Sequence, residues 1–217
     1  MRGLLVKDLR LLRNQKQFFL TVIMIAAVFM LAGQDLSFIV SYYSILAMFF
    51  AISTISYDEF NNGYATLFTM PITRKQYVME KYLFALLLGG GVWAAAALLG
   101  AVIDAARDAE FVPVEWFASS AAVFAVMWTL MMVMIPINLK YGTEKSRSAS
   151  LVLMFVVFAV IMMLAKFEPL TLAFQNAVAR LEQLSGIGVL LSGAAALAAV
   201  TIISMAAGVR TMSKKQF

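Results

Sequence analysis

The sequence contains six long apolar runs, and none of them includes Asp, Glu, Lys or Arg. Read with a window of about 19 residues, the runs extend over 18–33, 36–57, 82–103, 116–137, 151–165 and 186–209. One ionised side chain at the centre of a membrane span costs roughly 2.5 to 3.5 kcal/mol, so charge-free runs are typical of transmembrane helices. The chain is 63% hydrophobic and only 13% charged, which leaves too little polar surface for a water-soluble globule. We therefore expect an all-α polytopic membrane protein with six transmembrane helices, forming one domain over residues 1–217.

The basic residues are distributed unequally between the two sides of these runs. Fourteen of the 17 lie on alternate flanks that share one side: Arg2, Lys7, Arg10, Arg13, Lys16, Arg74, Lys75, Lys81, Lys140, Lys145, Arg147, Arg210, Lys214 and Lys215. The other side has three, Arg107, Lys166 and Arg180. Because basic flanks stay in the cytoplasm, both termini are predicted to be cytoplasmic. The positive net charge then indicates contact with anionic membrane lipid and not with nucleic acid.

Several residue types and motifs that enzymes need are missing. The chain has no His and no Cys, which argues against the usual zinc sites and excludes a Ser–His dyad. No phosphate-binding G-x-x-x-x-G-K-[ST] motif occurs, and no run holds an ionisable proton relay. We expect no catalytic, metal-binding or cofactor-binding residues, and energy for any uphill transport to come from another polypeptide. Sodium coupling through hydroxyl and backbone oxygens stays open.

The connection over residues 57–82 has the clearest local signals. A turn is expected at 61–63, followed by a short amphipathic helix over 64–70 that ends at Pro71, which lacks a backbone donor. Thr73 is then expected to cap the helix that leads into the third run.

The short helix is predicted to expose apolar side chains in the cytoplasm, namely Tyr64, Leu67, Phe68 and Met70. Exposed apolar side chains of this kind need a covering surface. Two interpretations stay open from the residues alone: a partner protein covers them, or the helix rests on lipid.

Three segments resemble the ABC-2 type permease family, the membrane half of ATP-binding cassette transporters. The first is the pattern Asp58, Glu59, Gly63, Leu67, Pro71, Arg74, Tyr77 and Lys81. The second is YGTEKSR, residues 141–147, and the third is KDLRLLRNQK, residues 7–16. They occur at the expected places along nearly the whole chain, and they are most similar to the small six-span branch that includes exporters of phenol-soluble modulins and antimicrobial peptides.

The resemblance implies that the 57–82 connection contains a coupling helix, which seats in a groove of a cytoplasmic ABC ATPase. The residues expected to contact that ATPase are Asp58, Glu59, Gly63, Tyr64, Leu67, Phe68, Pro71, Arg74, Lys75, Tyr141, Gly142 and Glu144. Among them, the charged residues 58, 59, 74 and 75 are expected to surround the contact and orient it. The segment 141–147 is expected to be a compact polar loop, either a second contact or simply a solvated loop.

The remaining segments give two further helices. The N-terminal segment predicts an interfacial helix with Leu4, Leu5, Leu9 and Leu12 on one face and Lys7, Arg10 and Arg13 on the opposite or flanking surface. A simple orientation signal is the alternative.

On the outer side, residues 169–186 predict an interfacial or re-entrant helix before the sixth span. Pro136 is expected to bend or end the fourth span.

The resemblance implies a permease subunit of an ATP-driven exporter in a bacterial plasma membrane, working by alternating access. Its expected partners are two copies of a cytoplasmic ABC ATPase, which carry the ATP and Mg²⁺, and a second permease subunit in a homodimer or heterodimer. An amphipathic or antimicrobial peptide is the expected substrate. The alternative is a non-transporting membrane subunit that docks a cytoplasmic partner in an assembly or sensory complex.

Overall fold

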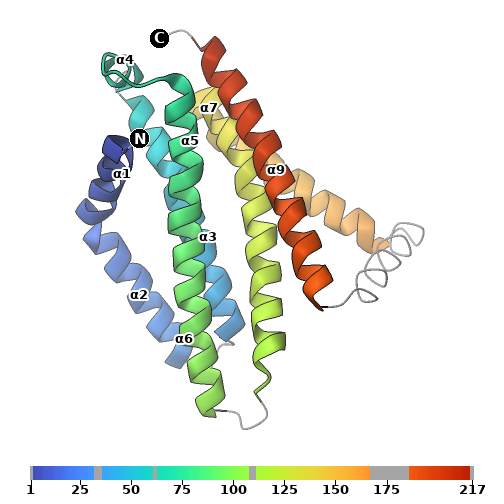
Figure 1. Ribbon diagram of the computed structural model, residues 1–217. Coiled ribbons are helices and arrows are strands. Elements are labelled where there is room, and N and C mark those ends of the chain that lie inside the picture. Colours follow the sequence, from blue (N-terminus) through green and yellow to red (C-terminus); the bar gives the residue numbers. More distant parts are fainter. Residues whose placement is uncertain (1, 32–35, 61–62, 108–110, 167–185, 216–217) are drawn as a thin grey trace.

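The computed structural model describes residues 2–31, 36–60, 63–107, 111–166 and 186–215, where the regular elements are helices (Figure 1). In chain order they are α1 Arg2–Asn14, α2 Lys16–Leu31, α3 Leu36–Glu59, α4 Gly63–Leu67, α5 Arg74–Ala85, the π-helical turn η2 Leu86–Gly90, α6 Gly91–Arg107, α7 Pro113–Lys166 and α9 Gly186–Lys214. The start of α1, α4, the start of α5 and the end of α9 lie at one end of the bundle, which we call the charged end.

Four helical stretches in the described residues are long and apolar enough to cross a membrane. They are Leu36–Glu59, Arg74–Ala106, Pro113–Gly142 and Leu191–Lys214. A shorter apolar helix, Phe19–Met30, lies within α2, whose 16 residues extend about 24 Å at 1.5 Å per residue. This is less than the roughly 30 Å of a bilayer core. An all-helical, membrane-type architecture is thus confirmed for the described residues, with four long spans and one shorter apolar helix, and the number of six spans stays a prediction.

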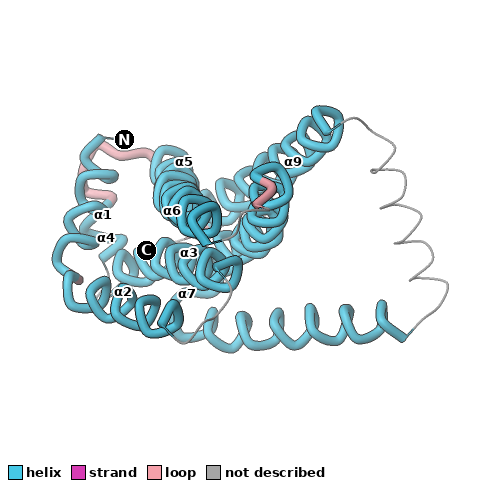
Figure 2. The backbone as a smooth tube through the Cα atoms, turned by 90° about the horizontal axis from the view of Figure 1, so that it is seen from below, coloured by secondary structure: helices cyan, strands magenta, loops and turns pink. Residues whose placement is uncertain are grey.

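Two predicted segments remain, the fifth apolar run and the outer helix before the sixth span. The fifth apolar run, 151–165, lies in the second half of α7, which Figures 1 and 2 show diverging from α9. The predicted outer helix at 169–186 falls almost entirely outside the described residues.

The non-helical residue within α7 is Gly142 and not Pro136, where the helix was expected to bend or end. The helix continues through Pro136, whereas Gly142 has φ 73° and ψ −178°, outside the helical region. A proline removes one hydrogen bond, which a helix packed on both sides can tolerate, but only glycine adopts this φ and ψ readily. The predicted polar loop at 141–147 is accordingly a helical segment interrupted at a single residue.

The start of α5 is fixed by Thr73, as the sequence predicts. The backbone N–H of Gln76 donates to Thr73 Oγ1 at 3.2 Å, and the Thr73 N–H donates to Gln76 Oε1 at 3.1 Å. This reciprocal capping box satisfies two backbone donors at the helix start. From this cap, α5, η2 and α6 continue as one membrane-length rod.

Tryptophan and hydroxyl side chains join the spans by hydrogen bonds. Trp116 Nε1 donates to the Ala97 carbonyl at 3.0 Å, and Trp128 Nε1 donates to Thr201 Oγ1 at 2.9 Å. A Cβ on Gly100 would lie 2.5 Å from the Trp116 ring, so glycine is needed for this close approach of α6 and α7. Such small-residue contacts and polar links are typical of packed membrane helices.

Candidate functional site

Helix α4 folds back closely onto the end of α3. It begins at Gly63, where an added Cβ would lie 2.5 Å from the Asp58 carbonyl oxygen, so only glycine fits without a shift. The helix ends at Leu67, and the chain then makes two tight turns before Thr73, with the Ile72 N–H donating to the Met70 carbonyl at 2.7 Å. Pro71 lies in this turn, but α4 already ends at Leu67, so the predicted helix over 64–70 is three residues too long at its end.

Three aromatic rings hold α4 against α5. The ring centroids of Tyr64 and Tyr77 are 5.8 Å apart, those of Phe68 and Tyr77 are 5.9 Å apart, and those of Tyr64 and Phe68 are 6.4 Å apart. Tyr64 is 3% exposed and Leu67 is 9% exposed, and Phe68 packs partly buried against the same core. Desolvation of the phenolate by this burial raises the pKa of Tyr64 well above its ordinary value, so the side chain stays neutral.

This packing corrects the prediction that the short helix exposes its apolar face. Tyr64 and Leu67 are covered by the chain itself, because α4 turns back onto α3 and α5. The apolar side chains that are exposed here are Phe60, at 71%, and Met70, at 53%. Pro71 is exposed beside Met70.

A cluster of buried charges lies beneath this surface, where α1 meets α3 and α5. Lys81 Nζ is 2.5 Å from Asp8 Oδ2 and 2.7 Å from Asp58 Oδ2, and it donates to Thr54 Oγ1 at 3.1 Å. Tyr77 OH donates to Asp58 Oδ2 at 3.1 Å. Asp8 is fully buried and Lys81 is 2% exposed. Charges removed from water in this way are stable only when paired closely, so the cluster ties three helices together.

Lys7 completes the cluster from the partly exposed side. Its Nζ binds the second oxygen of Asp58 and is 3.2 Å from Asp8 Oδ1. Asp58 is therefore buried and engaged through both oxygens, which corrects its predicted role as an exposed charge around a partner contact. No local signal predicts this burial, because a carboxylate beside Glu59 at a helix end is usually solvated.

Helix α1 is oriented by this cluster as well as by its leucines. Leu4 is buried, and Leu5 and Leu12 pack partly buried against the core, but Leu9 is 56% exposed. Asp8 occupies the inward face between Leu4 and Leu12, one helical turn from each. Leu9 therefore turns outward with the exposed Arg10 and Arg13, which corrects the prediction that the four leucines share one face.

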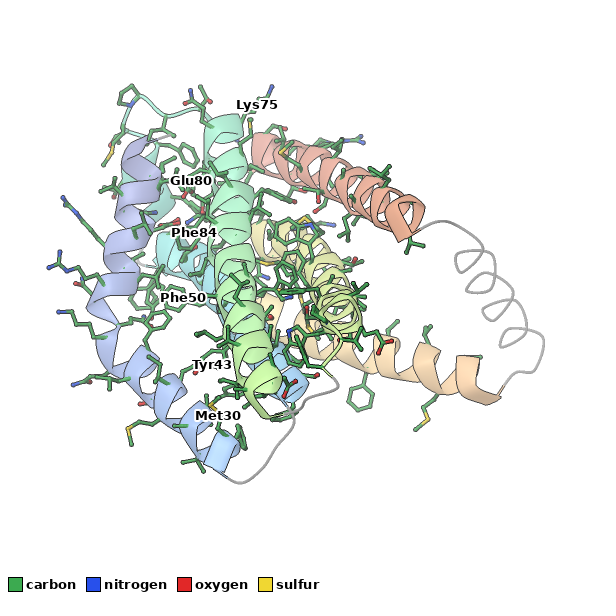
Figure 3. The ribbon with its side chains drawn as sticks, turned by 60° about the horizontal axis from the view of Figure 1, so that its bottom comes forward. Met30, Tyr43, Phe50, Lys75, Glu80 and Phe84 are labelled. Carbon is green, nitrogen blue, oxygen red and sulfur yellow. The ribbon has the colours of Figure 1, made fainter. Side chains whose placement is uncertain are left out.

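Glu80 is the unusual member of the region. It is fully buried, and neither carboxylate oxygen accepts a hydrogen bond from the described residues. Lys81 is the cation beside it, with 3.9 Å between Nζ and Oε2. Figure 3 shows Glu80 between α1 and α5, whereas Lys75 lies at the start of α5, at the charged end.

Arg74 joins α5 to the end of α9. Its Nη1 donates to the carbonyls of Met212 at 2.9 Å, Ser213 at 3.0 Å and Lys215 at 2.6 Å. A helix C-terminus leaves such carbonyls without partners, and a guanidinium satisfies several at once. Arg74 thus acts inside the chain as a cap, contrary to its predicted role as an orienting surface charge.

Glu59, Lys215 and Gly142 form a second junction. Lys215 Nζ donates to Glu59 Oε1 at 2.9 Å and to the Leu139 carbonyl at 3.2 Å, and it lies 4.8 Å from the centroid of the Tyr64 ring. The Glu59 carboxylate fills the notch at Gly142, where an added Cβ would lie 2.5 Å from Oε1. Glu59 and Gly142 therefore connect α3 to the bend in α7, instead of facing outward as predicted.

The remaining residues predicted to contact the ATPase are Lys75, Tyr141 and Glu144. Lys75 and Tyr141 are exposed, Tyr141 at 47%. The side chain of Glu144 lies outside the described residues.

The sequence did not single out Asp8 or Thr54, although the placement of Asp8 between Leu4 and Leu12 on one helical face was a usable signal. In the described residues, no group of three acidic side chains is placed to hold a metal ion.

The comparison with known families covers almost the whole chain. A family model described as ABC-2 family transporter protein matches residues 3–213. The chain belongs to the ABC-2 transporter family. No curated protein and no solved structure gives a match.

The matched range extends from α1 into the last turn of α9 and so includes most of the charged end. A member of the ABC-2 family is a transmembrane permease subunit of an ABC transporter. Membership also implies that the chain associates with a cytoplasmic ABC ATPase.

Proposed function

We propose that this ABC-2 family member is the permease subunit of an exporter that moves amphipathic or antimicrobial peptides out of a bacterial cell. It works with two copies of an ABC ATPase, which bind ATP and Mg²⁺, and with a second permease subunit in a homodimer or heterodimer. The charged end and both termini face the cytoplasm, in agreement with the 14 basic residues on that side. The substrate class rests on the resemblance to the small peptide-exporter branch.

The observation that carries the proposal is the rigid connection between the exposed turn at Met70 and Pro71 and the third membrane span. Below the turn, Tyr64 and Leu67 are buried against α5. After the turn, the Thr73 capping box starts α5, which continues into the membrane. A force applied at Met70 would therefore move a span and not merely deform a loop.

Two further connections extend the linkage to the other spans. Arg74 holds the C-terminal carbonyls of α9, and Glu59 links Lys215 to the bend at Gly142 in α7. The charged end thus behaves as one block, because packed elements joined by several contacts move together. ATP-driven closure of the ATPase would move α5, α7 and α9 together.

The structure also changes which residues are the best candidates for the ATPase contact. Met70, Pro71, Lys75 and Tyr141 have exposed surface, and we assign them to the contact. The buried or engaged residues of the same region hold this surface in position. A large exposed apolar side chain is a usual anchor of a protein interface, and Met70 is 53% exposed, so it is the proposed anchor.

The test is a Met70→Asp variant reconstituted with the cognate ABC ATPase in vesicles. An aspartate at the centre of an apolar contact would leave a charge unpaired, so we expect at least a tenfold loss of peptide-stimulated ATP hydrolysis and of peptide accumulation in inverted vesicles. Met70→Leu keeps the apolar volume and should retain both activities.

Normal coupling in Met70→Asp, with both variants folded to the same extent, would refute the proposed contact. A complex that forms but whose ATPase ignores every amphipathic peptide, without movement of peptide, would instead support the non-transporting docking subunit.

A further inference from the structure

A basic hollow lies between α7 and α9 at the charged end. It has a volume of about 390 Å³ and is lined by Lys140, Arg210, Thr211, Lys214 and Lys215. Four of these five residues are cationic, and no carboxylate is among them. A concave surface with one sign of charge concentrates its field and favours an ion of the opposite sign.

Most of this charge is not neutralised by the chain itself. Lys215 binds Glu59 and the Leu139 carbonyl. By contrast, Lys140, Arg210 and Lys214 are exposed, and in the part of the chain that the structure describes none of them forms an ion pair with a carboxylate. Three cations from two helices are therefore available to one ligand.

The two helices also present apolar surface directly below these cations. Val133 precedes Lys140 by seven residues in α7 and is 40% exposed, and Ile203 precedes Arg210 by seven residues in α9 and is 70% exposed. Residues seven apart share one helical face, separated by about 10 Å along the axis. Each helix thus presents an apolar side chain at bilayer depth and a cation two turns closer to the water.

We infer that this hollow binds the phosphate headgroup of an anionic phospholipid, with the acyl chains lying along the surface near Val133 and Ile203. A basic pocket between membrane helices fits a phosphate-bearing headgroup. The apolar strip favours a membrane lipid over a soluble phosphate, which would use only the cations.

The test compares two variants that remove the same charge from the same side of the membrane. Lys140→Gln/Arg210→Gln/Lys214→Gln removes the three exposed cations of the hollow. Arg10→Gln/Arg13→Gln/Lys16→Gln is the matched control, because these three side chains are also exposed but lie on α1 and α2. Native mass spectrometry would count phosphatidylglycerol retained by each purified protein from mixed phosphatidylglycerol and phosphatidylcholine micelles.

We expect the wild-type chain and the control to retain phosphatidylglycerol in preference to phosphatidylcholine. In the variant that lacks the three cations of the hollow, this preference should be at least tenfold lower than in the wild-type chain. Equal losses in the two variants, or no preference in the wild-type chain, would overturn the inference. The wild-type measurement needs no substitution and so does not depend on the folding of a variant.

A second arm replaces the lipid with glycerol 3-phosphate in pure phosphatidylcholine micelles. We expect no increase in thermal stability with this soluble phosphate, whereas phosphatidylglycerol should raise the melting temperature of the wild-type chain and the control. Equal stabilisation by glycerol 3-phosphate would overturn the lipid as the source of the phosphate. Protection by the ABC ATPase alone, without any lipid effect, would also overturn it and point to a protein contact.

Discussion

Replacing Lys81 by Met should strongly destabilise the charged end. The Lys81 side chain is 1% exposed, and its Nζ lies 2.5 Å from Asp8 Oδ2 and 2.7 Å from Asp58 Oδ2. Methionine has a similar length and fills the space, but it leaves the two buried carboxylates with Lys7 as their one cation in the described residues, and the Lys7 side chain is 32% exposed. Removing one partner of a buried ion pair typically reduces the free energy of unfolding by about 3–5 kcal/mol.

Unfolding can be followed by the fluorescence of the three tryptophans, Trp93, Trp116 and Trp128, during denaturant titration in micelles of fixed composition. Lys75→Met is the matched control, because Lys75 is on the same helix, carries the same charge and is exposed. We expect Lys81→Met to lower the transition midpoint markedly and Lys75→Met to leave it nearly unchanged.

Combining Lys81→Met with Asp8→Asn should recover part of the lost stability, since the second change removes one of the uncompensated charges. Residues in one ion-pair network typically show coupling energies of about 0.5–3 kcal/mol. Strictly additive effects, or equal midpoints for Lys81→Met and Lys75→Met, would refute the reasoning that Lys81 is held between two buried carboxylates.

Two further substitutions test the junctions around this cluster. Gly142→Ala should destabilise the chain by about 1–3 kcal/mol, because φ 73° with ψ −178° is nearly restricted to glycine and the added Cβ would displace Glu59. The same denaturant titration measures this loss of stability. An unchanged midpoint would contradict the non-helical conformation at Gly142. Arg74→Lys should leave carbonyls at the end of α9 without a donor and increase amide hydrogen exchange there, since a lysine cannot reproduce the planar fork. Wild-type exchange rates in residues 210–215 would show that the cap is dispensable.

The sequence predicted individual elements well wherever the signal was local. Charge-free runs identified the long membrane helices, and Thr73 identified the start of α5. Pro71 correctly marked the turn after α4. These features depend on neighbours within a few residues, so local physical chemistry is sufficient.

The roles of charged residues were predicted less well, because they depend on partners far away in the chain. Lys81 and Asp8 are separated by 73 positions, and Arg74 and Met212 by 138. Nothing local distinguishes the buried Asp58 from its neighbour Glu59. The apolar side chains of α4 were expected to need a covering surface, either a partner protein or lipid, and the fold of the same chain covers Tyr64 and Leu67.

The sequence by itself determined that this chain is helical and apolar enough for a membrane, and that one end is basic. The tertiary structure decided which of those basic and acidic side chains are structural and which have free surface. The physical reason is that burial, and not residue type, sets the energy of a charge: Lys81 must be paired because three helices enclose it, whereas Lys140, Arg210 and Lys214 surround a hollow that is open to a ligand.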